Sequence, residues 1–322
     1  MRSIVWFRGK DLRLEDHEAL HSALSSDEII PLFVLDPYFF EPKQAAKLPH
    51  RMQFLLQSLE ALRQALAVRG SQLIIRRGRS IDVVPEMAAK WGADQVLAQR
   101  WSEPFARRRD QIVSSRLGCK LVLFEGETLV APGTIKTQQG APYSVFTPFS
   151  KRFLAQTDLS DPRPAPSWLP PLPASIQAQS ESIPSLADLG LTTNTNVLLG
   201  GAAHADQRMR LFVDQRVMSY PTARNRPDQE GTSRLGPDLK FGTLSPRQVW
   251  HAAQTAHADA QTDSFRRQLI WREFAHDLIW NQPQLLEQPF RKAFIGFPWK
   301  GTEDLWTAWV EGRTGYPIVD AS

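Results

Sequence analysis

Cysteine is almost absent from this sequence, since Cys119 is the single one in 322 residues. One thiol cannot form an internal disulfide, a four-thiolate iron–sulfur cluster or a cysteine-based zinc site, and we predict no metal site. No run of about 18 apolar residues is present, which argues against a membrane-spanning helix. The first residues lead directly into a strand-like run and lack the apolar core of a signal peptide. We therefore expect a cytoplasmic protein.

The net charge is also small, because 38 Lys and Arg stand against 34 Asp and Glu. The balance is uneven along the chain, and residues 51–152 contain sixteen basic and eight acidic side chains. Such a stretch is either a surface that faces a polyanion or a set of solvated helix faces. Charge alone favours the solvated faces.

Tryptophan, in contrast, is abundant, with ten in the chain and six of them at or after Trp250. Its side chain is large and amphipathic, so a cluster forms either a thick core or a platform for flat ligands. Composition does not choose between the two.

The first 125 residues or so alternate short apolar runs with helical patterns. The expected strands are residues 3–7, 29–35, 72–75, 95–98 and 120–124, and the expected helices are 15–24, 51–68, 81–91 and 104–116. Buried strands separated by helices predict a doubly wound, parallel five-stranded sheet. Ligands of such sheets bind at the carboxyl ends of the strands. The dinucleotide motif Gly-x-Gly-x-x-Gly is missing there, because Arg-Gly-Lys-Asp occupies residues 8–11.

The composition changes between residues 158 and 201, where proline, serine and threonine are frequent and a long linker is predicted. Helical patterns follow at residues 203–220, 245–258, 264–281 and 302–311. The sequence thus predicts three parts: an α/β domain at residues 1–130, a connecting segment at 131–200 and a helical domain at 201–322.

Two segments of the helical part carry side chains suited to ligand binding. Gly231 is followed by Thr232, Ser233 and Arg234, and hydroxyls, backbone N–H groups and a guanidinium bind phosphate; a plain turn explains the segment equally well. Helical spacing places Gln268, Trp271, Arg272 and Ala275 on one face, which suits a nucleobase. The competing interpretation is a core tryptophan beside a surface arginine. Trp306 and Trp309 are expected to be core anchors.

Five segments are more specific than their periodicity. They are Val-Trp-Phe-Arg at residues 5–8 with Asp-Leu-Arg-Leu at 11–14, Pro-Tyr-Ser-Val-Phe-Thr-Pro-Phe at 142–149, Thr-Ser-Arg-Leu at 232–235 with Phe-Gly-Thr-Leu-Ser-Pro-Arg at 241–247, Trp-Arg-Glu-Phe at 271–274, and Gly-Arg-Thr-Gly-Tyr-Pro-Ile-Val-Asp-Ala at 312–321. In this order they resemble the DNA photolyase/cryptochrome family over nearly the whole chain. An unrelated nucleotide-binding protein would need all five to coincide.

The resemblance implies an antenna-type α/β domain, a helical FAD-binding domain and light-driven reversal of pyrimidine dimers in DNA by a monomer. It implies that Arg224 contacts the DNA backbone, that Gln268, Trp271 and Arg272 line the lesion pocket and that Trp299 transfers electrons. The resemblance also allows an antenna pigment, a folate or a deazaflavin, and does not determine which. The residues that it implies for FAD are Tyr220, Thr232, Ser233, Arg234, Leu235, Gly236 and Phe265.

The sequence also departs from the family pattern. The opening motif carries one extra residue at Gly9-Lys10, Gly236 replaces a frequent serine, and Gln268 stands where many enzymes that repair cyclobutane dimers have glutamate. The amide of Gln268 can hydrogen-bond a base, but it cannot supply the protonated acid that stabilises a radical anion during repair. The alternative is therefore a cryptochrome-type photoreceptor without repair activity. Family members continue beyond residues 312–321 into helices that close over the flavin ring. We therefore interpret the FAD-binding domain as incomplete, and expect the 322 residues alone to bind FAD weakly or not at all and to lack repair activity.

Overall fold

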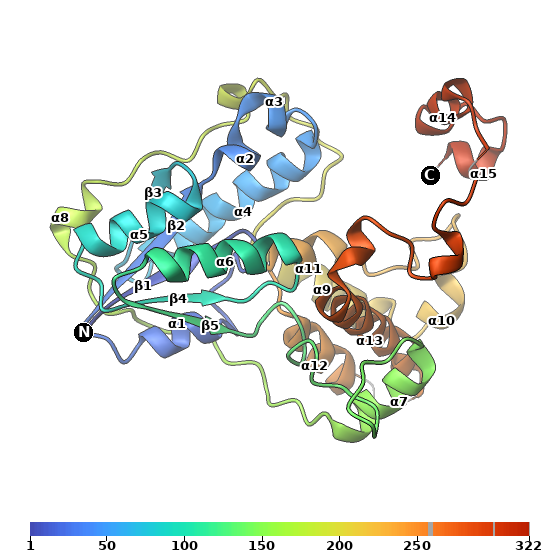
Figure 1. The fold of residues 1–322 in the computed structure, drawn as a ribbon, viewed down its shortest axis with the longest axis horizontal. Coiled ribbons are helices and arrows are strands. Elements are labelled where there is room, and N and C mark those ends of the chain that lie inside the picture. The colour runs from blue at the N-terminus through green and yellow to red at the C-terminus, as the bar shows by residue number, and fades with distance from the viewer. Residues whose placement is uncertain (257–259, 299, 322) are drawn as a thin grey trace. The chain divides into compact units, whose positions relative to one another are not determined.

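The computed structural model describes residues 1–256, 260–298 and 300–321. The chain forms two compact units, Met1–Pro283 and Gln284–Ser322. Figure 1 shows the strands and their covering helices within the first unit.

Five parallel strands form the sheet of the first unit, in the order β3-β2-β1-β4-β5. They are β1 (Arg2–Phe7), β2 (Glu28–Leu35), β3 (Ile74–Arg77), β4 (Gln95–Gln99) and β5 (Lys120–Phe124). The predicted parallel sheet is confirmed, and β3 begins two residues later than expected because Ile74 pairs with Leu32. The chain changes direction across the sheet between β1 and β4, so their carboxyl ends frame the crevice in which such folds bind ligands.

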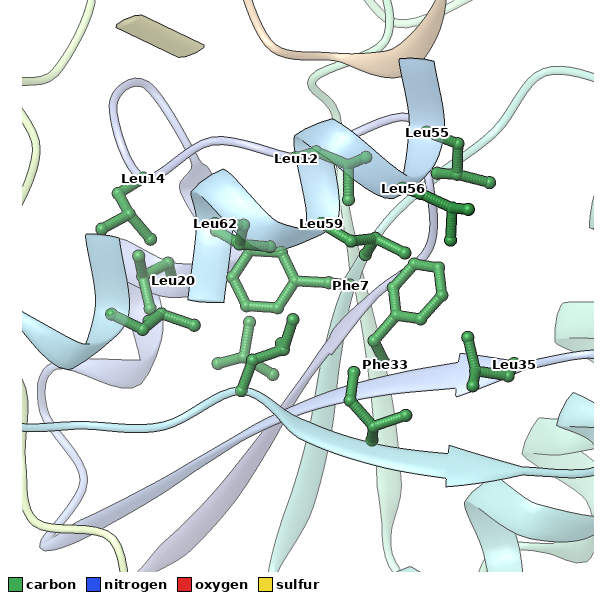
Figure 2. Close-up of a cluster of buried hydrophobic side chains, with 14 of the residues drawn as sticks. Phe7, Leu12, Leu14, Leu20, Phe33, Leu35, Leu55, Leu56, Leu59 and Leu62 are labelled. Carbon is green, nitrogen blue, oxygen red and sulfur yellow. The ribbon is translucent and has the colours of Figure 1, made fainter. Parts of the chain in front are cut away.

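Helices cover both faces of this sheet. Successive strand residues point to opposite faces, so Val5 and Phe7 belong to one core, and Ile4 and Trp6 to the other. The first core includes apolar side chains of α1 (Glu18–Ala23) and α4 (Pro49–Ala67). Figure 2 shows Phe7 and Phe33 packed beneath the leucines of α4. The second core includes α5 (Ser80–Lys90) and α6 (Pro104–Arg116).

The predicted linker packs against the α/β part. Its apolar side chains Leu169, Leu172, Ile176 and Leu189 are all buried, and the N–H of Glu181 donates to the carbonyl of Ile75. The segment therefore extends the core over the edge of β3, in spite of its proline content.

Further helices of the first unit lie in two connections. Between β2 and α4 they are α2 (Pro37–Phe40) and α3 (Pro42–Ala45), and between β5 and residue 201 they are α7 (Phe146–Gln156), α8 (Ala174–Gln177) and η1 (Ala187–Leu189).

The helical part of the first unit builds a third core that is rich in aromatic side chains. Its helices are α9 (Ala202–Gln215), α10 (Tyr220–Ala223), α11 (Gly236–Phe241), α12 (Pro246–Ala256) and α13 (Ala260–Asn281). The single helix expected at residues 203–220 is therefore wrong at its end, because α9 stops at Gln215 and Tyr220 starts another helix. The core joins Phe149 and Phe153 of α7 to Phe212 of α9 and Phe265 of α13.

The second unit consists of short helices with exposed apolar side chains: η2 (Pro283–Leu286), η3 (Lys292–Phe294), α14 (Glu303–Val310) and α15 (Pro317–Asp320). Thr302 caps α14 as its hydroxyl accepts from the N–H of Leu305. The expectation that Trp306 and Trp309 are core anchors is wrong, because they are 58% and 56% exposed and touch each other, with ring centres 5.2 Å apart. In the described part of the chain, no helix has the length and apolarity needed to cross a membrane.

Candidate functional site

The predicted phosphate loop at residues 231–236 lies against the short helix α10. A Cβ on Gly231 would come within 2.4 Å of the backbone of Ala223, so only glycine allows this close approach. The loop therefore stands beside the helix that starts with Tyr220. The structure thus brings together two of the segments that the sequence analysis singled out.

The donors of this loop fit the phosphates of a nucleotide cofactor. Thr232 and Arg234 are exposed and Ser233 is half-buried, and the Ser233 hydroxyl accepts from the N–H of Leu235 at 3.4 Å, which leaves its own proton to donate. Arg234 has a φ of 52°, a left-handed conformation that a bulky residue adopts at a cost. Its guanidinium lies 3.7 Å from Glu230. Two hydroxyls and a guanidinium on one turn form a donor set that suits an anion.

Tyr220 lies behind the loop in an aromatic cluster. Its ring meets those of Phe212 and Phe265 edge-on, with ring centres 5.8 and 5.3 Å away. Burial raises the pKa of the Tyr220 phenol, so the hydroxyl stays protonated and can donate. The guanidinium of Arg224 lies 5.3 Å from the Tyr220 ring and is open to solvent.

The second predicted surface lies on α13. Gln268 is half-buried, and Trp271 is 46% exposed, which contradicts the competing interpretation of a core tryptophan. The Trp271 ring stacks on Phe146, the first residue of α7, with ring centres 3.6 Å apart and planes only 6° from parallel. One face of the indole is thus covered and the helix presents the side chain to solvent.

Arg272 makes contacts within the protein. Its Nη1 donates to the main-chain carbonyl of Glu127 at 2.6 Å, and the same nitrogen lies 3.7 Å from the Glu273 carboxylate. The Arg272 side chain is 21% exposed. Its predicted contact with a lesion therefore stays a prediction, and its observed role is to attach α13 to the loop that follows β5.

A buried polar cluster underlies this attachment. The carboxylate of Glu127 accepts from the N–H and hydroxyl of Ser102 at 2.7 and 2.9 Å and pairs with the ammonium of Lys10. Burial would raise the pKa of Glu127, but Lys10, His276 and these hydrogen bonds hold it at about 2. Burial and Arg272 lower the pKa of His276 to about 3, so this ring, hydrogen-bonded to Ser102, is neutral near pH 7. The carboxyl ends of β1 and β4 are thereby tied to α13.

Two acidic side chains of α13 bind the backbone of the same loop. Glu273 accepts from the N–H groups of Leu129 and Val130 at 2.8 and 3.3 Å, and Asp277 accepts from that of Gly133 at 2.7 Å. Burial raises the pKa of Glu273 to about 7, although Arg272 and these N–H groups act in the opposite direction. Loop 127–133 therefore fixes the helix that carries Gln268 and Trp271.

A pocket of about 350 Å³ opens between α4 and α11. Phe54 and Phe241 form its aromatic part, with rings stacked 5.2 Å apart. The basic side chains that line it are those of Arg51 and Lys240, and the His50 ring lies beside them. Burial lowers the pKa of Lys240, with Lys10 acting in the same direction. The pocket combines a flat apolar surface with positive charge.

Two residues of this arrangement, Phe146 and Glu127, are not among the predicted site residues. Phe146 lies within the segment 142–149 that was recognised as specific, but no periodicity indicated that it faces Trp271. Glu127 had no signal, because its partners Lys10, Ser102 and His276 come from three separate stretches of chain. Trp299, the predicted electron-transfer residue, lies outside the described residues.

The first unit thus combines a doubly wound parallel sheet, a loop with hydroxyl and guanidinium donors at residues 232–234 and a half-exposed aromatic plane on α13. Residues 3–169 match the family described as DNA photolyase, and residues 265–322 match the FAD binding domain of DNA photolyase. The chain belongs to the DNA photolyase/cryptochrome family, and the second match indicates FAD.

Similar proteins include photolyases and a cryptochrome. The deoxyribodipyrimidine photo-lyase of Synechococcus sp. is 34% identical over 99% of this chain and 69% of its own length. The crystal structure of a class III photolyase from Agrobacterium tumefaciens matches with a TM-score of 0.88 and 29% identity, over 99% of this chain and 67% of that one. A cryptochrome from Synechocystis sp. matches with a TM-score of 0.86 and 25% identity, over 100% of this chain and 70% of that one.

Proposed function

We propose that this chain has the photolyase-type function, in which light-driven electron transfer from reduced FAD splits pyrimidine dimers in DNA; that the 322 residues alone bind FAD weakly or not at all and lack repair activity stays a prediction. The observation that carries the proposal is the half-exposed plane of Trp271, stacked on Phe146 beside the amide of Gln268. A flat aromatic surface next to a hydrogen-bonding group suits a base that has left the DNA stack. Family membership supports the same function.

In this proposal FAD is held by the loop and the aromatic cluster described above. Thr232, Ser233 and Arg234 donate to its phosphates, while Tyr220 and Phe265 close the site from α10 and α13. Leu235 and Gly236 shape the turn between them. When bound, FAD supplies the light-driven electron; the protein holds the cofactor and presents the lesion. The role of Trp299 in electron transfer stays a prediction.

On DNA, we assign Trp271 to stacking against an unpaired pyrimidine, which is worth about 1–3 kcal/mol per base. Gln268 donates and accepts hydrogen bonds at the base edge, and the exposed guanidinium of Arg224 contacts a phosphate. Arg272, at the border of this face, has further N–H groups that can reach the lesion. Arg267 adds a cation, 5.4 Å from the ring of Phe146.

We assign the antenna pigment, either a folate or a deazaflavin, to the pocket between α4 and α11. Both pigments contain a flat heterocycle, which suits the stacked Phe54 and Phe241, and the carboxylates of a folate also suit Arg51 and Lys240. Addition of each pigment to the purified chain tests this assignment. Binding should shift the pigment's absorption spectrum, and Lys240→Ala should weaken the binding.

Dark binding to damaged DNA tests the proposed function. An oligonucleotide duplex with one cyclobutane pyrimidine dimer and the same duplex intact are titrated at one fixed salt concentration, because salt alone changes such affinities greatly. We expect about tenfold tighter binding of the damaged duplex, lost in Trp271→Ala. Trp168→Ala is the matched control, because Trp168 is 61% exposed in the segment that packs on the α/β part.

A cryptochrome-type photoreceptor without repair activity is the second candidate. The amide of Gln268, in place of an acid, favours it, as does the match to the Synechocystis cryptochrome. Equal affinity for damaged and intact DNA in the same titration would support this candidate and contradict the repair function.

A further inference from the structure

The stack between Trp271 and Phe146 has an unusual geometry. Aromatic rings prefer offset or edge-to-face contacts to a full face-to-face sandwich, yet these planes are 6° from parallel with centres 3.6 Å apart. The attraction of the two rings therefore does not set this arrangement by itself. The positions of α7 and α13 impose it, since each ring comes from one of these helices.

Phe146 is a rigid support for the tryptophan. It is 5% exposed, and its ring also meets that of Phe274, with centres 6.0 Å apart at 68°. Phe274 in turn touches the edge of Trp271 at 5.9 Å and 72°. Three rings from two helices thus fix one another, and of the three only Trp271 is half-exposed.

We propose that Phe146 is the positioning residue that sets the plane of Trp271 for stacking on an unpaired pyrimidine. A half-exposed indole without this support samples several rotamers and loses entropy when a base stacks on it. Phe146 restricts the ring before the ligand arrives, which preserves affinity. The support acts on the covered face, so the opposite face of the indole is the one that receives the base. This inference rests on the proposed function.

Two substitutions separate the flat shape of Phe146 from its apolar volume. Phe146→Leu keeps an apolar side chain but removes the plane, whereas Phe146→Tyr keeps the plane. We expect Phe146→Leu to bind the dimer-containing duplex at least fivefold more weakly, with affinity for intact duplex unchanged. Phe146→Tyr should bind the dimer-containing duplex with an affinity within twofold of that of the original chain. Phe146→Met serves the same comparison if Phe146→Leu fails to fold.

The outcomes distinguish this inference from the proposed function. If Trp271→Ala weakens dimer binding and Phe146→Leu does not, the positioning role is wrong. It is also wrong if Phe146→Leu and Phe146→Tyr lose the same affinity for the dimer-containing duplex, or if Phe146→Leu lowers the affinity for damaged and intact duplex equally. A residue with a merely structural role produces those results. If Trp271→Ala itself leaves dimer binding unchanged, Trp271 does not stack on the lesion. The proposed function is then wrong at this face, and so is the role of Phe146.

Discussion

At the scale of single residues, two glycines of the phosphate loop are under very different constraints. Gly231 lies against the backbone of Ala223, whereas a Cβ on Gly236 would meet nothing within 4 Å. The sequence alone treats them alike, because the contact comes from α10, which precedes the loop by several residues. Steric fit of this kind is visible only once the chain is folded.

We therefore predict that Gly231→Ala destabilises the protein by about 1–3 kcal/mol, since the backbone of one segment must move to accommodate the methyl group. Gly236→Ala, the matched control, should change the free energy of unfolding by less than about 0.5 kcal/mol. Urea unfolding of both variants measures this. Equal stability of the two would show that the loop does not lie against α10 as described.

Glu273 gives a prediction about pH. Its pKa is raised to about 7 by burial, so the folded protein holds this proton more tightly than the unfolded chain, where the pKa is about 4.3. The resulting stabilisation is complete below about pH 4.3 and is lost as the pH rises through 7. His276, with its lowered pKa, acts in the opposite direction as the pH falls below about 6.5.

Glu273→Gln removes the proton-dependent part and keeps an acceptor for the N–H groups of Leu129 and Val130. Between pH 5 and pH 8, the unmodified chain should lose about 2 kcal/mol more stability than this variant. Urea titrations at the two pH values provide the comparison. The same pH dependence in both proteins would exclude Glu273 as the titrating group.

At the scale of elements, the strands followed from the sequence more closely than the connections. Continuous apolar runs predicted β1, β2, β4 and β5 to within one residue at each end, because strands buried on both faces must be apolar throughout. The short helices α7, α10 and α11 were missed. Each carries proline or glycine within or at the start of its sequence. Packing stabilises them more than local propensity does, against α13 for α7 and α10 and against α4 for α11.

The buried carboxylate of Glu127 is one part of the attachment of α13 to the α/β part, because it shares the Ser102 hydroxyl with His276 of α13. Its removal leaves the ammonium of Lys10 with Glu103 alone and breaks the contact with Ser102. Loss of one partner from a buried ion pair typically costs about 3–5 kcal/mol. We predict a loss in that range for Glu127→Ala.

Glu125→Ala is the matched control, because Glu125 lies two residues away and pairs with Arg100 at 3.1 Å while both side chains are about one third exposed. It should cost less than about 1 kcal/mol. Thermal or urea unfolding distinguishes the two. A similar small loss in both variants would mean that the cluster does not hold α13 in place.

At the scale of the whole molecule, the sequence predicted an α/β part followed by helices, and both are present. The boundaries at residues 130 and 200 stay predictions, since one compact unit spans Met1–Pro283. The sequence pattern could not show that residues 158–201 pack on the α/β part, because a proline-rich composition indicates local stiffness and says nothing about burial. Nor could it show that Trp306 and Trp309 lie at the surface of the second unit.

The central claim is that the phosphate loop and the Trp271 face of the first unit serve one cofactor-dependent reaction on DNA. If so, FAD and dimer-containing DNA occupy neighbouring parts of one site, and we expect each to raise the affinity for the other, by the same factor because such coupling is reciprocal. The decisive measurement is the dark affinity of the chain for the dimer-containing duplex with and without saturating FAD.

We predict that FAD tightens this binding at least about fivefold, leaves the intact duplex unaffected and loses its effect in Arg234→Ala. Arg226→Ala is the control, because Arg226 is an exposed arginine of the same stretch that pairs with Asp228. In this variant FAD should still tighten the binding of the damaged duplex. An affinity for damaged DNA that is identical with and without FAD would contradict the account.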